Sequence, residues 1–131
     1  AATGHVGADL TVEEAHGLAR ICALNALAAA AAEAGGLDSI IRVVKVVGFV
    51  ASAPGFTAQP TVINGASELL GAVFGAAGLH ARSAVGVAAL PLGAPVEVEL
   101  VVAVRPASPG TDTPGRREPA PGATAPRGPD N

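Results

Sequence analysis

Hydrophobic and polar positions along the first hundred residues predict five elements of secondary structure. Thr11 and Glu14 form a capping-box pattern before an alanine-rich stretch, which predicts a helix that begins there, runs to about Ala34 and ends at Gly35-Gly36. The helical spacing places an apolar stripe on one face of this helix, formed by Leu18, Ile21, Cys22 and Ala29. The sequence therefore predicts one long amphipathic helix near the N-terminus.

Three strand-like runs follow, with a second helix after the first of them. Residues 40–50 are almost continuously β-branched, which predicts a central strand. Apolar residues at helical spacing from Val62 to Val73 predict a helix that ends at Gly75. The turn-forming dipeptide Asn64-Gly65 leaves open whether this helix begins before or after it. Two further strands, residues 83–90 and 96–104, are expected to form a hairpin-like segment.

This order of elements predicts a single α+β domain over residues 1–104. Three strands packed on two helices leave strand edges and apolar faces uncovered, so we expect either other subunits or additional N-terminal strands to cover them. Residues 105–131 are rich in proline and glycine and contain almost no bulky apolar side chains. Such a composition cannot offset the entropy of ordering, and we predict a disordered tail there.

Composition and charge remove several classes of function. The formal net charge is −3, tryptophan and tyrosine are absent, and the three phenylalanines lie in apolar runs, so nucleic acid is not an expected partner. Neither a signal peptide nor a membrane-spanning segment is predicted, and we expect a cytoplasmic protein without a membrane partner. The single cysteine, Cys22, is expected to be a buried small side chain rather than a nucleophile.

Arg82 is the candidate binding residue, because it is a permanent cation among small and β-branched side chains. Its planar guanidinium matches a carboxylate with two parallel hydrogen bonds. That carboxylate could belong to a substrate, or it could be Glu97 or Glu99 on the next strand, and spacing alone leaves both open. The other polar candidates, His16, Asn64 and His80, are expected to be surface or helix-terminal residues.

Three segments resemble the reactive intermediate deaminase (Rid, or YjgF-like) family. Residues 43–50 (VVKVVGFV) resemble its central strand, and residues 59–68 (QPTVINGASE) resemble its second helix. Residues 81–91 (ARSAVGVAALP), followed by 96–99 (VEVE), resemble its signature. The resemblance extends over about residues 8–104. It implies a chorismate mutase-like fold, in which a mixed sheet packs on two helices and three subunits form a barrel-like trimer with a cleft at each interface.

The resemblance also implies a reaction and its residues. Arg82 would bind the carboxylate of a 2-imino or enamine acid, a backbone amide near Ala84 would help to hold it, and Glu97 would position water or transfer a proton. The products would be the 2-keto acid and ammonia, with no metal or organic cofactor. A non-catalytic trimeric binder of small carboxylates is the alternative, and ribonuclease activity is disfavoured by the acidic charge balance.

Two departures from the family pattern limit this resemblance. Ala84 occupies a position where many deaminase members have cysteine, so no thiol chemistry is expected there. The usual N-terminal strand pair, which supplies a serine-and-glycine segment and an aromatic residue to the cleft, is not found in the sequence. We therefore expect a sheet with about two fewer strands and a pocket that lacks one wall.

Overall fold

The computed structural model describes residues 1–106. Its α-helices and strands follow the predicted order: α1 (Val12–Ala34), β1 (Ile40–Ala51), α2 (Gln59–Phe74), β2 (Ala81–Val87) and β3 (Val96–Val104). Three short 3-10 turns lie between them: η1 (Leu37–Ser39), η2 (Gly75–Gly78) and η3 (Pro91–Gly93). The predicted α+β fold is confirmed, whereas the predicted tail lies, from residue 107 onward, outside the described residues.

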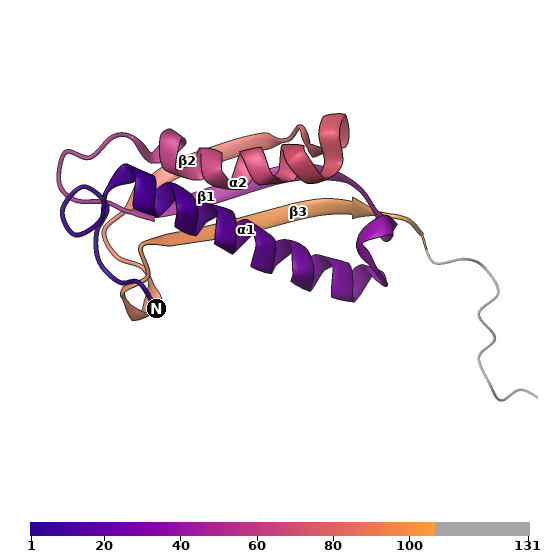
Figure 1. Ribbon diagram of the computed structural model, residues 1–131, viewed down its shortest axis with the longest axis horizontal. Coiled ribbons are helices and arrows are strands. Elements are labelled where there is room, and N and C mark those ends of the chain that lie inside the picture. The colour runs from indigo at the N-terminus through magenta and orange to yellow at the C-terminus, as the bar shows by residue number, and fades with distance from the viewer. Residues whose placement is uncertain (107–131) are drawn as a thin grey trace, which may run out of the picture.

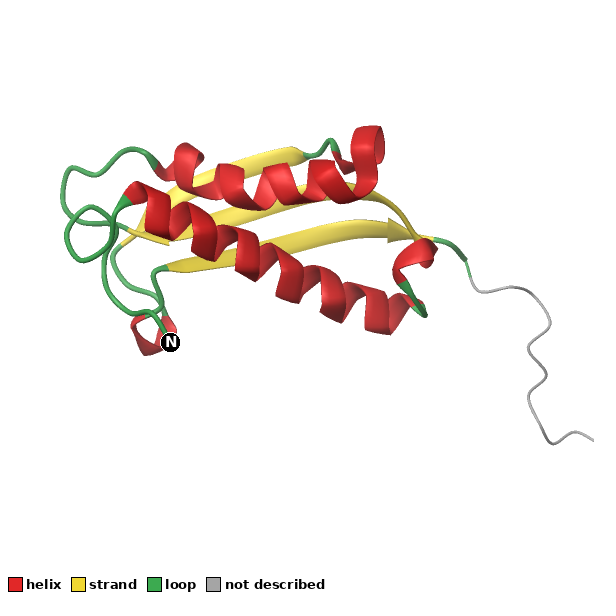
Figure 2. Cartoon of the chain, in the orientation of Figure 1, coloured by secondary structure: helices red, strands yellow, loops and turns green. Residues whose placement is uncertain are grey.

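The sheet is mixed, with β1 in the centre and the strand order β2-β1-β3. β2 pairs with β1 in parallel, and β3 pairs with it antiparallel. The expectation of a hairpin-like segment is therefore wrong, because β2 and β3 lie on opposite sides of β1. Figure 1 shows α1 and α2 side by side across the sheet, and Figure 2 separates this helical layer from the three strands. Parallel strands need a crossover connection, and α2 forms the one between β1 and β2.

Small side chains bring the two helices close together. The fully or nearly fully buried residues of α1 are Ala15, Ala19, Ala23 and Leu27. A Cβ atom at Gly65 of α2 would overlap the backbone carbonyl of His16 in α1, so only glycine fits this contact. The predicted apolar stripe is thus wrong in detail, since Ile21 is 51% exposed. Gly65 lies inside α2, which begins before the Asn64-Gly65 dipeptide and has Pro60 in its first turn.

The two faces of the sheet have different environments. The even-numbered positions of β1 from Val46 to Val50 face the helices, and Val46 and Val50 are fully buried there. Two register irregularities near Arg42 and Lys45 allow both cations to be exposed. On the opposite face Val85 of β2 is 43% exposed. In residues 1–106 both α-helices pack on one face of the sheet, and we call the other the open face.

The length of α1 bears on the predicted absence of a membrane-spanning segment. This helix has 23 residues and a window of mean hydropathy 1.3, so length and composition alone would allow it to cross a membrane. The core helix of a soluble protein passes the same test, and α1 packs on α2 and β3 in this fold. The absence of a membrane partner stays a prediction.

Candidate functional site

Arg82 points to the helical side of the sheet, where it contacts α2. It is paired in register with the buried Val46 of β1, and paired residues direct their side chains to the same face. Its Nη1 atom donates one hydrogen bond to Asn64 Oδ1 at 2.7 Å and another to Ser67 Oγ at 3.3 Å. Asn64 and Ser67 are three residues apart on one face of α2, so a single helix supplies both acceptors.

A second hydrogen-bonded pair continues from Ser67. The imidazole Nδ1 of His80 lies 2.6 Å from the Gly78 carbonyl oxygen, and its Nε2 lies 2.9 Å from Ser67 Oγ. Because a carbonyl oxygen can only accept, Nδ1 carries the proton, and in the neutral imidazole Nε2 accepts from the serine hydroxyl. The Ser67 oxygen then accepts from Arg82. We call Arg82, Ser67, His80 and the Gly78 carbonyl the arginine chain.

The hydrogen bonds from Arg82 to Asn64 and Ser67 determine which edge of the guanidinium remains for a ligand. Nη1 donates to both Asn64 Oδ1 and Ser67 Oγ. Among residues 1–106 the Nε and Nη2 atoms have no hydrogen-bond partner. These two atoms form one edge of the guanidinium, and this edge matches the two oxygens of a carboxylate. Arg82 is exposed, so this edge is accessible within the described chain.

Ala84 presents a backbone donor at the free edge of β2. The Val87 carbonyl accepts a hydrogen bond from Ser52 N at 3.0 Å, so the peptide groups of Val87 face the β1 side. Successive residues of a strand direct their N–H and C=O groups alternately to the two sides, which places the Ala84 N–H at the free edge. Arg82 and Ala84 also share one face of β2. The structure thus brings together two of the three predicted site residues.

Glu97 lies elsewhere in the chain. It belongs to β3, is paired with Phe49 of β1 and is exposed on the open face, as is Glu99. Two strand spacings, roughly 10 Å, separate β3 from β2, and Arg82 faces the other side of the sheet. Within residues 1–106 Arg82 bonds to Asn64 and Ser67 and not to a glutamate. The alternative that Arg82 pairs with Glu97 or Glu99 of its own chain is wrong.

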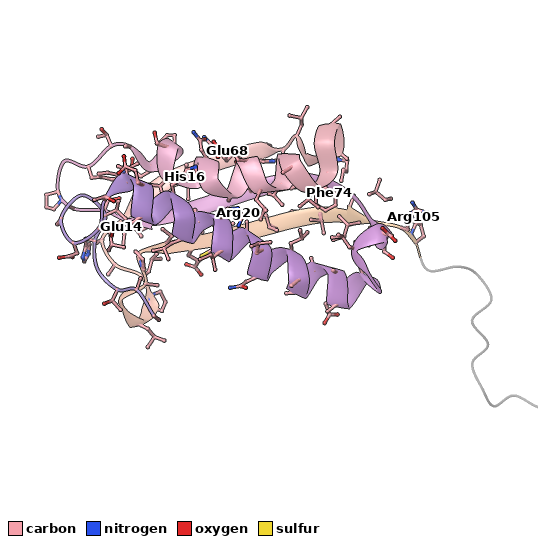
Figure 3. All side chains as sticks on the ribbon, viewed as in Figure 1. Glu14, His16, Arg20, Glu68, Phe74 and Arg105 are labelled. Carbon is pink, nitrogen blue, oxygen red and sulfur yellow. The ribbon has the colours of Figure 1, made fainter. Side chains whose placement is uncertain are left out.

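Two other polar groups lie near the helices and have structural explanations. His16 Nε2 of α1 lies 3.1 Å from Glu68 Oε2 of α2, and Figure 3 shows this pair on the outer side of the helical layer. Cys22 is half-buried, and its thiol is 3.8 Å from the Val96 carbonyl oxygen. Burial raises the pKa of the Cys22 thiol, and the negative charge of Glu97 raises it further. A raised pKa keeps the sulfur protonated near neutrality, which does not favour a nucleophile.

Ser67 is not among the residues predicted from the sequence, and Asn64 and His80 were expected to be surface or helix-terminal residues. Two spacings in the sequence could have indicated that these residues belong to one site. Asn64 and Ser67 share a helix face at i, i+3, and His80 lies two residues before Arg82, immediately ahead of β2. Neither spacing showed that α2 lies over β2, which is a property of the tertiary fold.

Comparisons with known proteins identify the family of this chain. The family model described as YjgF/chorismate mutase-like, putative endoribonuclease, matches residues 2–104. Protein TCP17 of Trypanosoma cruzi is 54% identical over 101 residues, which are 76% of this chain and 63% of that protein. The chain therefore spans less than two thirds of the length of this relative. It belongs to the YjgF/chorismate mutase-like family, as the sequence resemblance predicted.

Two solved structures share the fold. The crystal structure of protein Atu1372 of Agrobacterium tumefaciens, of unknown function, has a TM-score of 0.77 at 50% identity, covering 80% of this chain and 68% of that one. A putative endoribonuclease from Shewanella oneidensis MR-1 has a TM-score of 0.74 at 32% identity, covering 76% and 66%. The family and the three-stranded arrangement on two helices are thus established, whereas an activity is not.

Proposed function

We propose that this protein hydrolyses reactive 2-imino acids, and their enamine tautomers, to 2-keto acids and ammonia. The observation that supports this most directly is the free Nε/Nη2 edge of Arg82, beside the unpaired Ala84 N–H at the edge of β2. A small carboxylate bound there accepts two hydrogen bonds from the guanidinium and one from the backbone. Family membership supports the same class of substrate through the resemblance of residues 81–91.

The chemistry follows from an anchored carboxylate. Water adds to C2 of the imine and gives a carbinolamine; a proton then moves to nitrogen, the C–N bond breaks, and ammonia leaves as the keto acid forms. Arg82 holds the adjacent carboxylate, which fixes the position of C2 and offsets its negative charge. A carboxylate base such as Glu97 would orient the water and transfer the proton to the departing nitrogen. No metal or organic cofactor has a step in this proposal.

Glu97 can take this role only from a second copy of the chain. In one chain it lies on the opposite face and the opposite edge strand from Arg82. We therefore propose an assembly, with a homotrimer as the expected form, in which Glu97 of one copy approaches Arg82 of another. Such an interface would also cover exposed apolar side chains of the open face, including Val85.

Two other functions remain as alternatives. A non-catalytic binder of small carboxylates would use the same Arg82 edge without Glu97. Endoribonuclease activity appears in the description of the family and of the Shewanella relative. A net charge of −3 and the absence of tyrosine and tryptophan make an RNA-binding surface unfavourable, so we rank it below both carboxylate functions.

The experiment generates 2-iminobutanoate in situ with a threonine dehydratase and follows the release of 2-oxobutanoate. We expect the wild-type protein to accelerate release, and both Arg82→Ala and Glu97→Gln to lose at least about 100-fold of that acceleration. Mixing the two inactive variants under exchange conditions should restore activity to about a quarter of wild type, because random trimers then contain intact Arg82–Glu97 interfaces.

Each outcome separates the alternatives. No acceleration by assembled wild-type protein contradicts the enzyme, and binding of 2-oxobutanoate without turnover supports the binder. Failure of the mixed variants to recover activity contradicts a site shared between copies. Cleavage of an unstructured RNA that survives Arg82→Ala would favour the ribonuclease.

A further inference from the structure

We infer that Ser67 and His80 are positioning residues that hold the Arg82 guanidinium in the orientation required to bind a carboxylate. This inference rests on the proposed role of Arg82 as the carboxylate anchor. Neither residue contacts the free Nε/Nη2 edge, so neither is a catalytic residue. Their effect passes through the hydrogen bond that Ser67 Oγ accepts from Arg82 Nη1.

The direction of each hydrogen bond in the arginine chain follows from chemistry. The Gly78 carbonyl accepts from His80 Nδ1–H, which fixes the tautomer and leaves Nε2 as an acceptor. The Ser67 hydroxyl donates to that Nε2, so the lone pairs on its oxygen face Arg82. Without an acceptor at His80, the hydroxyl hydrogen of Ser67 is free to rotate toward Arg82. The imidazole therefore keeps Ser67 oriented as an acceptor.

Burial along the arginine chain supports a rigid arrangement. Arg82 is exposed, Ser67 and His80 are half-buried, and Gly78 is buried. The exposed guanidinium, which has many accessible rotamers, is thus connected through two side chains to a buried backbone carbonyl. A Cβ atom at Gly78 would overlap the Leu70 carbonyl, so this turn packs tightly against α2. Restricting the guanidinium before binding lowers the entropy lost when the carboxylate binds.

The use of Nη1 also has a consequence for specificity. Asn64 and Ser67 both accept from Nη1, so the Nε/Nη2 edge is the one left without a partner in residues 1–106. If Ser67 no longer accepts, one Nη1 hydrogen becomes free and the guanidinium can rotate about its side-chain bonds. A carboxylate then binds in several orientations, and C2 of the substrate is less well placed.

Two substitutions of His80 separate a positioning role from a merely structural one. His80→Asn retains an N–H near the position of Nδ1 and can still donate to the Gly78 carbonyl, but it loses the acceptor that faces Ser67. His80→Gln extends an amide oxygen toward Ser67 and loses the donor close to the backbone. A structural role predicts that His80→Asn behaves like wild type. A positioning role predicts instead that His80→Gln behaves like wild type and that His80→Asn does not.

The first readout is the affinity for 2-oxobutanoate, measured by calorimetry on the assembled protein. We expect Ser67→Ala and His80→Asn to weaken binding by about ten-fold, and His80→Gln by less than about three-fold, since a hydrogen bond to a charged group is lost only in the first two. Turnover of 2-iminobutanoate should show the same change in KM and a fall in kcat of more than about two-fold, because C2 of the substrate is less well placed. Ser39→Ala and His16→Gln are the matched controls, and neither should change binding.

The second readout needs no ligand. In spectra of protein with 15N-labelled arginine, the Arg82 signal is assigned by its absence in Arg82→Lys. We expect separate, slowly exchanging Nη signals in wild type and His80→Gln, and averaged signals in Ser67→Ala and His80→Asn. Unchanged Arg82 signals in Ser67→Ala would overturn the inference, as would unchanged 2-oxobutanoate affinity in that variant when Arg82→Ala abolishes binding. If Arg82→Ala itself leaves binding intact, the proposed function fails, and the Arg82 signals alone decide whether Ser67 and His80 hold the guanidinium.

Discussion

The two faces of the sheet differ in how many of their side chains are buried or hydrogen-bonded within one chain. We call the face that packs on the two helices the covered face. On the covered face, Val46 and Val50 are fully buried and Arg82 has two hydrogen-bond partners on α2. On the open face, Val85 is 43% and Val101 47% exposed, and Glu97 forms no ion pair or side-chain hydrogen bond with any residue from 1 to 106.

This difference separates the part of the candidate site that one folded chain forms from the part that the proposed assembly would add. The folding of a single chain orients the free Nε/Nη2 edge of Arg82, because α2 supplies the two acceptors of its Nη1 atom. In the proposed function, Glu97 would reach a bound substrate only from another copy of the chain. Substitutions on the covered face should therefore change the free energy of unfolding of the chain, and substitutions on the open face should change association.

The largest effect is expected for Gly65→Ala, within the helical layer of the covered face. The added Cβ would overlap the His16 backbone carbonyl, which cannot move without displacing α1. We expect the free energy of unfolding to fall by about 3 kcal/mol, as for a strongly overpacked core. Urea unfolding followed by circular dichroism measures this change.

Gly71→Ala is the matched control for Gly65→Ala. Gly71 lies in the same helix, and no atom lies within 4 Å of a Cβ placed there. Replacing an exposed helical glycine with alanine should raise the free energy of unfolding by about 0.5–1 kcal/mol. Equal effects of the two substitutions would contradict the close contact of α1 with α2.

A smaller effect should separate the two faces directly. Val50→Ala removes two methyl groups from a fully buried site and should lower the free energy of unfolding by about 2 kcal/mol at every protein concentration. Val85→Ala, on the open face, should cost less than about 0.5 kcal/mol in dilute protein and should mainly weaken self-association. Urea unfolding and sedimentation over a range of concentrations measure both quantities. If Val85→Ala lowered the free energy of unfolding as much as Val50→Ala does, at every protein concentration, the proposed difference between the two faces would be wrong.

The sequence predicted the elements better than their arrangement. Local chemistry was sufficient for α1, whose Thr11 cap and Gly35 end are both observed, and for the boundaries of β3. It failed where a distant contact decides the outcome. Gly65 suggested a turn, but in the fold it permits the contact with α1, and Ile21 matched an apolar stripe that the alanines form instead.

The candidate site shows the same limit. Arg82 could be selected from its chemistry, and Ala84 followed from the family resemblance of residues 81–91. The supposed hairpin placed Glu97 beside Arg82, since adjacent strands in sequence commonly pair. The crossover through α2 instead places β1 between the strands of Arg82 and Glu97. No local pattern in residues 80–104 predicts this strand order. Ser67 and His80 were missed because their proximity depends on the same crossover.

The smallest expected effect concerns the negative charge on the open face and its influence on Cys22. Burial raises the pKa of this thiol above its ordinary value, and the Glu97 charge adds to the increase. A raised pKa in the folded state means that the folded protein holds the thiol proton at a pH where the unfolded chain has lost it. The resulting stability is present below the ordinary thiol pKa and is lost as pH rises through the folded value.

Glu97→Gln should lower the pKa of Cys22, because it removes one of the two causes of the increase. At a fixed pH near the ordinary thiol pKa, we expect iodoacetamide to alkylate the variant about two-fold faster than wild type, the effect being small because solvent screens an exposed charge. Mass spectrometry of the folded protein follows the reaction over a series of pH values. Glu99→Gln is the control: this charge is not among the causes of the shift, and its removal should leave the rate unchanged. Equal acceleration by the two substitutions would show that Cys22 responds to the total charge of the open face. Acceleration by Glu97→Gln alone would confirm that this carboxylate, and not Glu99, raises the pKa of the thiol.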